Sequence, residues 1–195
     1  RFNEETFGDD DLALFRKMTG ATDWPRDAKG AIRTSAATIG SWRSQVVARL
    51  LQRVRTALDG VTAQVGHRVE LGVEVRVDWA DPAAGRPQSG QDYRILAGVA
   101  DRVDLWAYFG NDAKTPADVG RLTTLISSVV RTDRLTVSVG LWLGADSADV
   151  VGPARLRQAV AAADAAGSLS TNVTPAALLS ADHWTELAQA WPQWP

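Results

Sequence analysis

From residue 69 to the end of the chain, segments with the pattern of strands alternate with helical ones. Residues 69–78 read V-E-L-G-V-E-V-R-V-D, in which apolar and polar side chains alternate with the period of two that is typical of a strand. Further strands are expected at 103–110, 135–143 and 168–173. Helices are expected at 92–100, 116–129, 153–167 and 175–191. Because parallel strands need crossover connections, this alternation predicts an α/β fold with a parallel sheet.

The first third of the chain is less regular. Residues 1–5 have the pattern of the end of a strand, and a helix is expected at 12–18, which the carboxylates at 9–11 can cap. A long polar loop at 20–38 precedes a long amphipathic helix at 39–65. The count is five strands and at least five helices. Either a doubly wound open sheet or the last five units of an eight-stranded barrel fits this count.

The two faces of the expected strands differ in polarity. In 69–78 the Val and Leu residues share one face, and the other face carries Glu70, Glu74, Arg76 and Asp78. Central strands of an open α/β sheet are covered on both faces and should read as nearly continuous apolar sequence, which these do not. The pattern therefore favours a parallel (β/α) barrel with a polar interior, comprising strands four to eight of a TIM-type barrel. The alternative is an antiparallel sheet with one wet face, and the intervening helices argue against it.

Polar and aromatic side chains fall on the inward face near the carboxyl ends of the strands. They are Asp78, Trp106, Tyr108, Trp142 and Asn172. Active sites of barrels lie at that end, and aromatic rings combined with acids suit a sugar, whose C–H patches pack on rings and whose hydroxyls bind carboxylates. Glu74 and Arg76 lie deeper, and we expect them to form a buried ion pair with a structural role.

Composition excludes several classes of function. The net charge of −2 argues against nucleic acid as a partner, because phosphate binding needs a basic face. No apolar run approaches the length of a membrane span, and the absence of cysteine excludes disulfides and thiolate metal sites. No glycine-rich nucleotide motif is present, and His67 and His183 have no partners at metal-ligand spacing. Neither a cofactor nor a metal is therefore expected.

The N-terminal sequence carries a resemblance to a known family. F-N-E-E-T-F-G, followed by D-x-x-L-x-x-F-R-x-x-T-G, resembles strand four of barrel-type glycoside hydrolases and the helix after it. Many of these enzymes end that strand with Asn-Glu, and barrels acting on poly-N-acetylglucosamine have Phe-His-Asp-Asp there. The segment S-W-R-S-x-V-V-x-x-L-L-x-x-V-R at 41–55 is similar to the next helix in bacterial barrels of this kind.

The resemblance implies roles for the first residues. By position Glu4 would be the general acid/base and Asn3 would bind substrate, whereas strand alternation would turn Asn3 and Glu5 inward, so both glutamates are candidates. Glycosidases need a second carboxylate, about 5 Å away in retaining enzymes and about 6.5–9.5 Å away in inverting ones. Many related barrels have it at the end of strand seven, but the corresponding strand here ends Trp142-Leu143-Gly144. Asp78 is the best replacement.

Three functions are weighed. The leading hypothesis is a secreted or envelope-associated bacterial hydrolase that acts on a polysaccharide. The second is a carbohydrate-binding pseudoenzyme, which is supported by the absence of an acidic residue at the end of the strand expected at 135–143. The third is a barrel enzyme acting on a phosphorylated metabolite. It ranks low because such barrels usually bind phosphate on glycine-rich loops after strands seven and eight, and Gly144 and residues 172–175 are poor candidates for these loops. The 195 residues form one domain or the C-terminal part of a larger (β/α)8 barrel, and because the chain starts at Arg1 we expect a missing N-terminal barrel segment.

Overall fold

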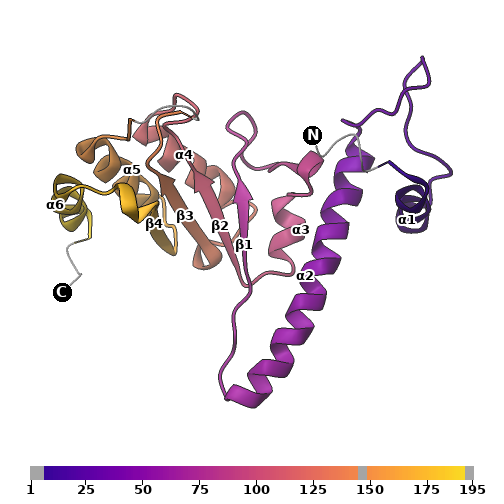
Figure 1. Ribbon diagram of the computed structural model, residues 1–195, viewed down its shortest axis with the longest axis horizontal. Coiled ribbons are helices and arrows are strands. Elements are labelled where there is room, and N and C mark those ends of the chain that lie inside the picture. The colour runs from indigo at the N-terminus through magenta and orange to yellow at the C-terminus, as the bar shows by residue number, and fades with distance from the viewer. Residues whose placement is uncertain (1–6, 145–148, 192–195) are drawn as a thin grey trace.

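The chain folds around a parallel β-sheet with helices between its strands (Figure 1). The computed structural model describes residues 7–144 and 149–191. The strands are β1 (Gly72–Arg76), β2 (Arg102–Ala107), β3 (Leu135–Gly140) and β4 (Ser170–Thr174). All neighbouring pairs are parallel, and the order across the sheet is the order along the chain. The predicted parallel α/β fold is confirmed, while the strand expected at 1–5 lies outside the described residues.

The register of the sheet places side chains of the four strands in rows. One row is Glu74, Asp104, Thr136 and Ser170, and the next is Arg76, Trp106, Ser138 and Asn172. Side chains opposite one another on adjacent strands share a face, because successive residues of a strand point to opposite sides. The polar face predicted from the sequence is therefore continuous across all four strands.

The helices cover the opposite, apolar face. They are α3 (Tyr93–Ala97), α4 (Pro116–Ile126), α5 (Pro153–Ala165) and α6 (Ala181–Ala190). Val75, Leu105 and Val137 of the strands are buried in one cluster with Leu122 of α4 and Leu156 of α5. Since these strand residues share a face, the main core lies on one side of the sheet. A doubly wound sheet would be covered on both sides.

Several element boundaries differ from the predicted ones. A single helix was expected at 175–191, but the structure has a short 3-10 turn, η3 (Ala176–Leu178), followed by α6. The reason is a capping box at Ser180, whose hydroxyl accepts from the His183 backbone N–H while the His183 ring accepts from the Ser180 N–H. The third strand ends at Gly140, and Trp142 instead forms an isolated antiparallel bridge with Val150.

The N-terminal part of the chain has a small core of its own. Helices α1 (Asp9–Thr19) and α2 (Ala37–Val65) enclose Phe15, Trp24, Ile39 and Trp42. Trp24 comes from the predicted 20–38 loop and is buried against the rings of Phe15 and Trp42. In Figure 1 the long α2 separates α1 from α3 and the sheet. The N-cap of α1 is Gly8 without a side-chain cap, so the carboxylates at 9–11 lie inside the first turn and act on the helix dipole.

A buried ion pair links α2 to the amino-terminal ends of the first two strands of the sheet. The guanidinium of Arg55 donates to a carboxylate oxygen of Asp101 at 2.7 Å and to the carbonyl of Val69 at 2.8 Å. Asp101 also accepts from the backbone N–H of Leu71 at 2.9 Å. These bonds fix the connection between α2 and β1. No helix in the described residues is long and apolar enough to span a membrane.

Candidate functional site

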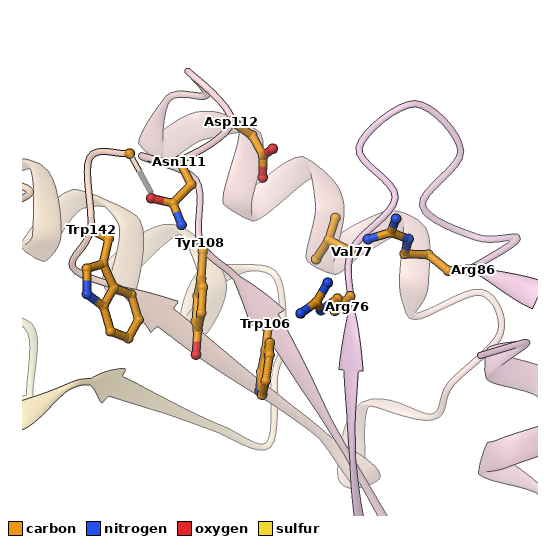
Figure 2. A pocket seen from close by; sticks show the side chains of 9 residues that line it. Arg76, Val77, Arg86, Trp106, Tyr108, Asn111, Asp112 and Trp142 are labelled. Carbon is orange, nitrogen blue, oxygen red and sulfur yellow. The ribbon is translucent and has the colours of Figure 1, made fainter. Parts of the chain in front are cut away.

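Three aromatic rings stand in succession on the polar face near the carboxyl ends of β2 and β3. We call Trp106, Tyr108 and Trp142 the aromatic row. The rings of Trp106 and Tyr108 are parallel, with an interplanar angle of 4° and centroids 5.4 Å apart. The Tyr108 and Trp142 centroids are 5.1 Å apart at an angle of 50°. Figure 2 shows the three rings side by side, as strand alternation predicted for these residues.

Tyr108 is held by the two strands beyond its own. Its ring occupies the space in which a side chain at Gly140 would lie. Burial raises the pKa of the Tyr108 hydroxyl above its ordinary value, and the nearby charge of Glu74 raises it further. Hydrogen bonds with Ser138 and Thr174 act in the opposite direction. The phenol therefore stays neutral and fixed across β3 and β4, and it supports the middle of the aromatic row.

The aromatic row borders a pocket of about 580 Å³ at this end of the sheet. The lining consists of the aromatic row with Arg76, Val77, Arg86, Asn111, Asp112 and Gly144. An adjoining pocket of about 430 Å³ shares Val77, Arg86 and Asp112 with it. A pocket of 300–1,000 Å³ with apolar walls and a few converging polar groups is typical of a small-molecule site.

Two arginines line the β1 side of the main pocket. The guanidinium carbon of Arg76 lies 5.8 Å from the centroid of the Trp106 ring, within the range of a cation–π contact. The expected buried ion pair of Glu74 and Arg76 is wrong, because both residues are exposed and no ion pair joins them in the described part of the chain. The guanidinium of Arg76 lies over the ring of Trp106 on the neighbouring strand instead.

The acids near the pocket are held by hydrogen bonds to neutral groups. A carboxylate oxygen of Asp112 accepts from the indole N–H of Trp79 at 2.7 Å. Asp78 accepts from the backbone N–H groups of Ala80 at 2.9 Å and Asp81 at 3.2 Å, one oxygen taking both bonds. Asp78 lines the adjoining pocket, whereas Asp112 lines both. Among the described residues no cluster of His, Cys, Asp or Glu could hold a metal ion.

The remaining predicted site residues lie elsewhere. Asn172 is exposed on β4 and lines a separate pocket with Trp184 and Trp191 at that edge of the sheet, away from the aromatic row. Asn3, Glu4 and Glu5 lie outside the described residues. Sequence reasoning missed the pocket residues in the loops after β1 and β2, among them Arg86, Asn111 and Asp112. The one feature of the sequence that could have indicated them is their position directly after the carboxyl ends of the expected strands.

Comparison with known proteins gives a likeness in structure. No family model and no curated protein matches the sequence. The fold is similar to that of the spore cortex-lytic enzyme SleL of Bacillus megaterium QM B1551, with a TM-score of 0.56 and 12% sequence identity. The match covers 75% of this chain and 45% of that one, so the chain spans less than half the length of the enzyme it matches. At this identity the likeness shows the fold alone: an α/β arrangement with a partial resemblance to the barrel of SleL.

Proposed function

We propose that this chain is the C-terminal part of a (β/α) barrel that binds a polysaccharide of the cell envelope or the extracellular space and hydrolyses its glycosidic bonds. In this proposal the described strands are strands five to eight, and residues 1–5 contribute the end of strand four. The one-sided cover of helices supports it, because a barrel keeps its helices on the outside and its polar side chains inside. The likeness to a cortex-lytic enzyme is consistent with a glycan substrate.

The aromatic row is the observation that carries this function. Trp106, Tyr108 and Trp142 are half-buried rings that line one pocket, with charged and amide groups beside them. Rings of this kind in a soluble pocket offer apolar contact area to the C–H groups of a sugar, while the polar neighbours bind its hydroxyls. A neutral, anchored phenol in the centre keeps the surface rigid, which lowers the entropic cost of binding.

Hydrolysis would use carboxylates at the rim of this pocket. In the proposal Glu4 acts as general acid/base, with Glu5 as the alternative, and Asp78 supplies the second carboxylate. The backbone N–H groups of Ala80 and Asp81 both donate to the same carboxylate oxygen of Asp78, Oδ1, and the side chain lines the adjoining pocket. Asp112, which lines both pockets, is a further group that can accept from a sugar hydroxyl.

The test combines binding with turnover on a panel of envelope and extracellular polysaccharides. Glu4→Gln, Glu5→Gln and Asp78→Asn should leave glycan binding intact, and loss of the acid/base should lower hydrolysis by about 100-fold or more. Trp106→Ala and Trp142→Ala should weaken binding itself. Trp184→Ala is the matched control, because this indole is 54% exposed on α6, outside the pocket. Full turnover in all three carboxylate variants would contradict the catalytic assignment.

A non-catalytic glycan-binding barrel is the second candidate. The observation that favours it is the end of β3, where Trp142, Leu143 and Gly144 provide no acid. Of the described residues that line the main pocket, Asp112 alone carries a carboxylate. Saturable binding that depends on Trp106 and yields no product from any bound polysaccharide would select this alternative.

A further inference from the structure

The main pocket is divided by charge. The aromatic row occupies its β2 and β3 side, and two guanidinium groups, those of Arg76 and Arg86, occupy its β1 side. Figure 2 shows Arg76 on the opposite side of Trp106 from Tyr108, with Arg86 beyond it. A sugar that lies against the aromatic row would therefore extend toward two positive charges.

Both arginines are free to bind an anion. Neither guanidinium forms an ion pair within the described residues, although other arginines of the chain, such as Arg55 and Arg102, do. The nearby carboxylates of Asp112 and Asp78 are hydrogen-bonded to the Trp79 indole and to backbone N–H groups. Among the described residues, no carboxylate therefore lies in an ion pair with either guanidinium, and both can pair with a carboxylate of a ligand.

Gln91 fixes the backbone of both arginines. Its side-chain oxygen accepts from the Arg76 N–H at 2.8 Å, and its backbone exchanges two hydrogen bonds with Arg86, at 2.8 and 3.0 Å. The carbonyl of Arg76 also accepts from the Tyr93 hydroxyl at 2.5 Å. The loop after β1 turns at Gly85, which has a φ of +69° and lies so close to the Gln91 carbonyl that a side chain would overlap it. Gln91 therefore fixes the backbone positions from which the two arginine side chains reach the mouth of the pocket.

We propose that the pocket selects a glycan whose sugar rings carry a carboxylate, and that Arg76 and Arg86 bind this carboxylate while the ring packs against the aromatic row. The inference rests on the proposed glycan-binding function and names its substrate class. Guanidinium groups bind carboxylates through paired, charge-assisted hydrogen bonds, which are stronger than bonds between neutral groups. A sugar with a hydroxymethyl group at the same position would make neutral hydrogen bonds only.

The test uses pairs of oligosaccharides that share their linkages and differ only in a carboxylate. Each pair consists of a neutral hexasaccharide and its hexuronate counterpart, on several backbones, with binding measured by calorimetry on the whole chain. The hexuronate member should bind about tenfold or more tightly, and the preference should weaken as salt is raised. Arg76→Gln and Arg86→Gln should each remove most of this preference, whereas Arg53→Gln, an exposed arginine on α2, should keep it.

The outcomes separate this inference from the function on which it rests. Equal binding of neutral and acidic partners, or an undiminished preference in both arginine variants, would overturn the carboxylate assignment and leave glycan binding intact. Failure to bind any member of the panel would overturn both. Displacement of the hexuronate by millimolar inorganic phosphate would show a general anion site and would also overturn selection for a sugar acid. Arg76→Lys serves as the second variant, because it keeps the charge but loses the paired geometry, and it should retain part of the preference.

Discussion

The phenol ring of Tyr108 fills the space above Gly140 that a side chain at position 140 would need. This relationship joins β3 to the aromatic row, because the one residue of that strand without a side chain lies under the central ring. The adjacent strand residues, Ser138 and Thr174, then reach the hydroxyl of the same tyrosine. The position of the middle ring thus depends on a glycine that does not itself line the pocket.

Gly140→Ala is expected to displace Tyr108 and weaken glycan binding. The added methyl group would overlap the ring, and overpacking at a buried position costs about 1–3 kcal/mol of unfolding free energy. Urea denaturation and oligosaccharide titration together measure the two effects. Gly60→Ala is the matched control: this site inside the C-terminal part of α2 has open space around it, so the change should stabilise the protein by up to about 1 kcal/mol. Unchanged binding in Gly140→Ala would contradict the role of the contact.

Tyr108 should ionise only at a pH above the ordinary range of tyrosine. Burial, together with the charge of Glu74, raises its pKa, so the folded protein should lose stability as the pH rises above about 10, where the unfolded phenol ionises first. The chain has two tyrosines, and the pKa of Tyr93 is also raised by burial. Phenolate absorbance in Tyr93→Phe isolates Tyr108, and the same protein in denaturant gives the reference. If Tyr108 in the folded protein ionised at the same pH as in the denatured protein, the prediction would be wrong.

The apolar and polar faces of the sheet were predictable because side chains alternate along a strand. Val75, Leu105 and Val137 are buried on the helix side, as their spacing predicted. Helix ends were less predictable: the 175–191 segment divides at Ser180, where a capping box that includes a histidine starts α6. The third position of a capping box is usually Glu or Gln, and with histidine there the sequence pattern only weakly indicates this boundary.

Asp101 is expected to contribute strongly to stability through its buried partner. Asp101→Asn removes the more buried of the two carboxylates that pair with the Arg55 guanidinium, which is 8% exposed, and leaves it with Asp59, which is 57% exposed; this should cost about 2–3 kcal/mol of unfolding free energy. Arg68→Met removes the other partner of the same carboxylate, but this side chain is 61% exposed and should cost less than about 1 kcal/mol. Equal costs in the two variants, measured by urea denaturation, would contradict this prediction.

The same carboxylate should make stability depend on acid pH. Burial alone would raise the pKa of Asp101, but hydrogen bonds from Arg68 and Leu71 and the charges of Arg68 and Arg55 together lower it. The stabilisation is therefore fully present above the unfolded pKa of about 3.9 and is lost as the pH falls through the lower folded value. In Asp101→Asn this part of the pH dependence should disappear, which a series of denaturation curves between neutral and acid pH would detect.

His183 should be a structural residue. The ring nitrogen Nδ1 accepts from the Ser180 N–H at 3.2 Å, so the other nitrogen, Nε2, carries the proton and donates to the Val151 carbonyl at 2.8 Å. His183→Ala should cost about 1–2 kcal/mol through the lost cap and the unpaired carbonyl. His67 is exposed and provides the control, with an expected change within about 0.5 kcal/mol. Thermal unfolding of both variants measures the difference.

The aromatic row was predictable from strand parity, but its charged neighbours were not. Trp106 follows the alternation of β2, which places it on the polar face. Arg86 and Asp112 lie in loops, where no periodicity relates sequence position to direction in space. Parity also placed Arg76 on the correct face, but it carries no information about the partner that a long side chain reaches. Asn172 also lies on the polar face by strand alternation. Because it is on β4, the last strand described, it lines a different pocket from the one beside the aromatic row.

The strands follow one another across the sheet in the order of the chain, and this order makes the binding surface modular. Each strand with its following loop supplies one part of the pocket: Arg76 and Arg86 from β1 and its loop, Trp106, Tyr108 and Asp112 from β2 and its loop, and Trp142 from the loop after β3. Because Tyr108 of the β2 unit packs over Gly140 of β3, the aromatic contributions of these two units depend on each other, whereas the backbone of both arginines is held by Gln91 from the same connection. The charged end of the pocket can therefore change as one unit, while the aromatic part changes only when both units change together.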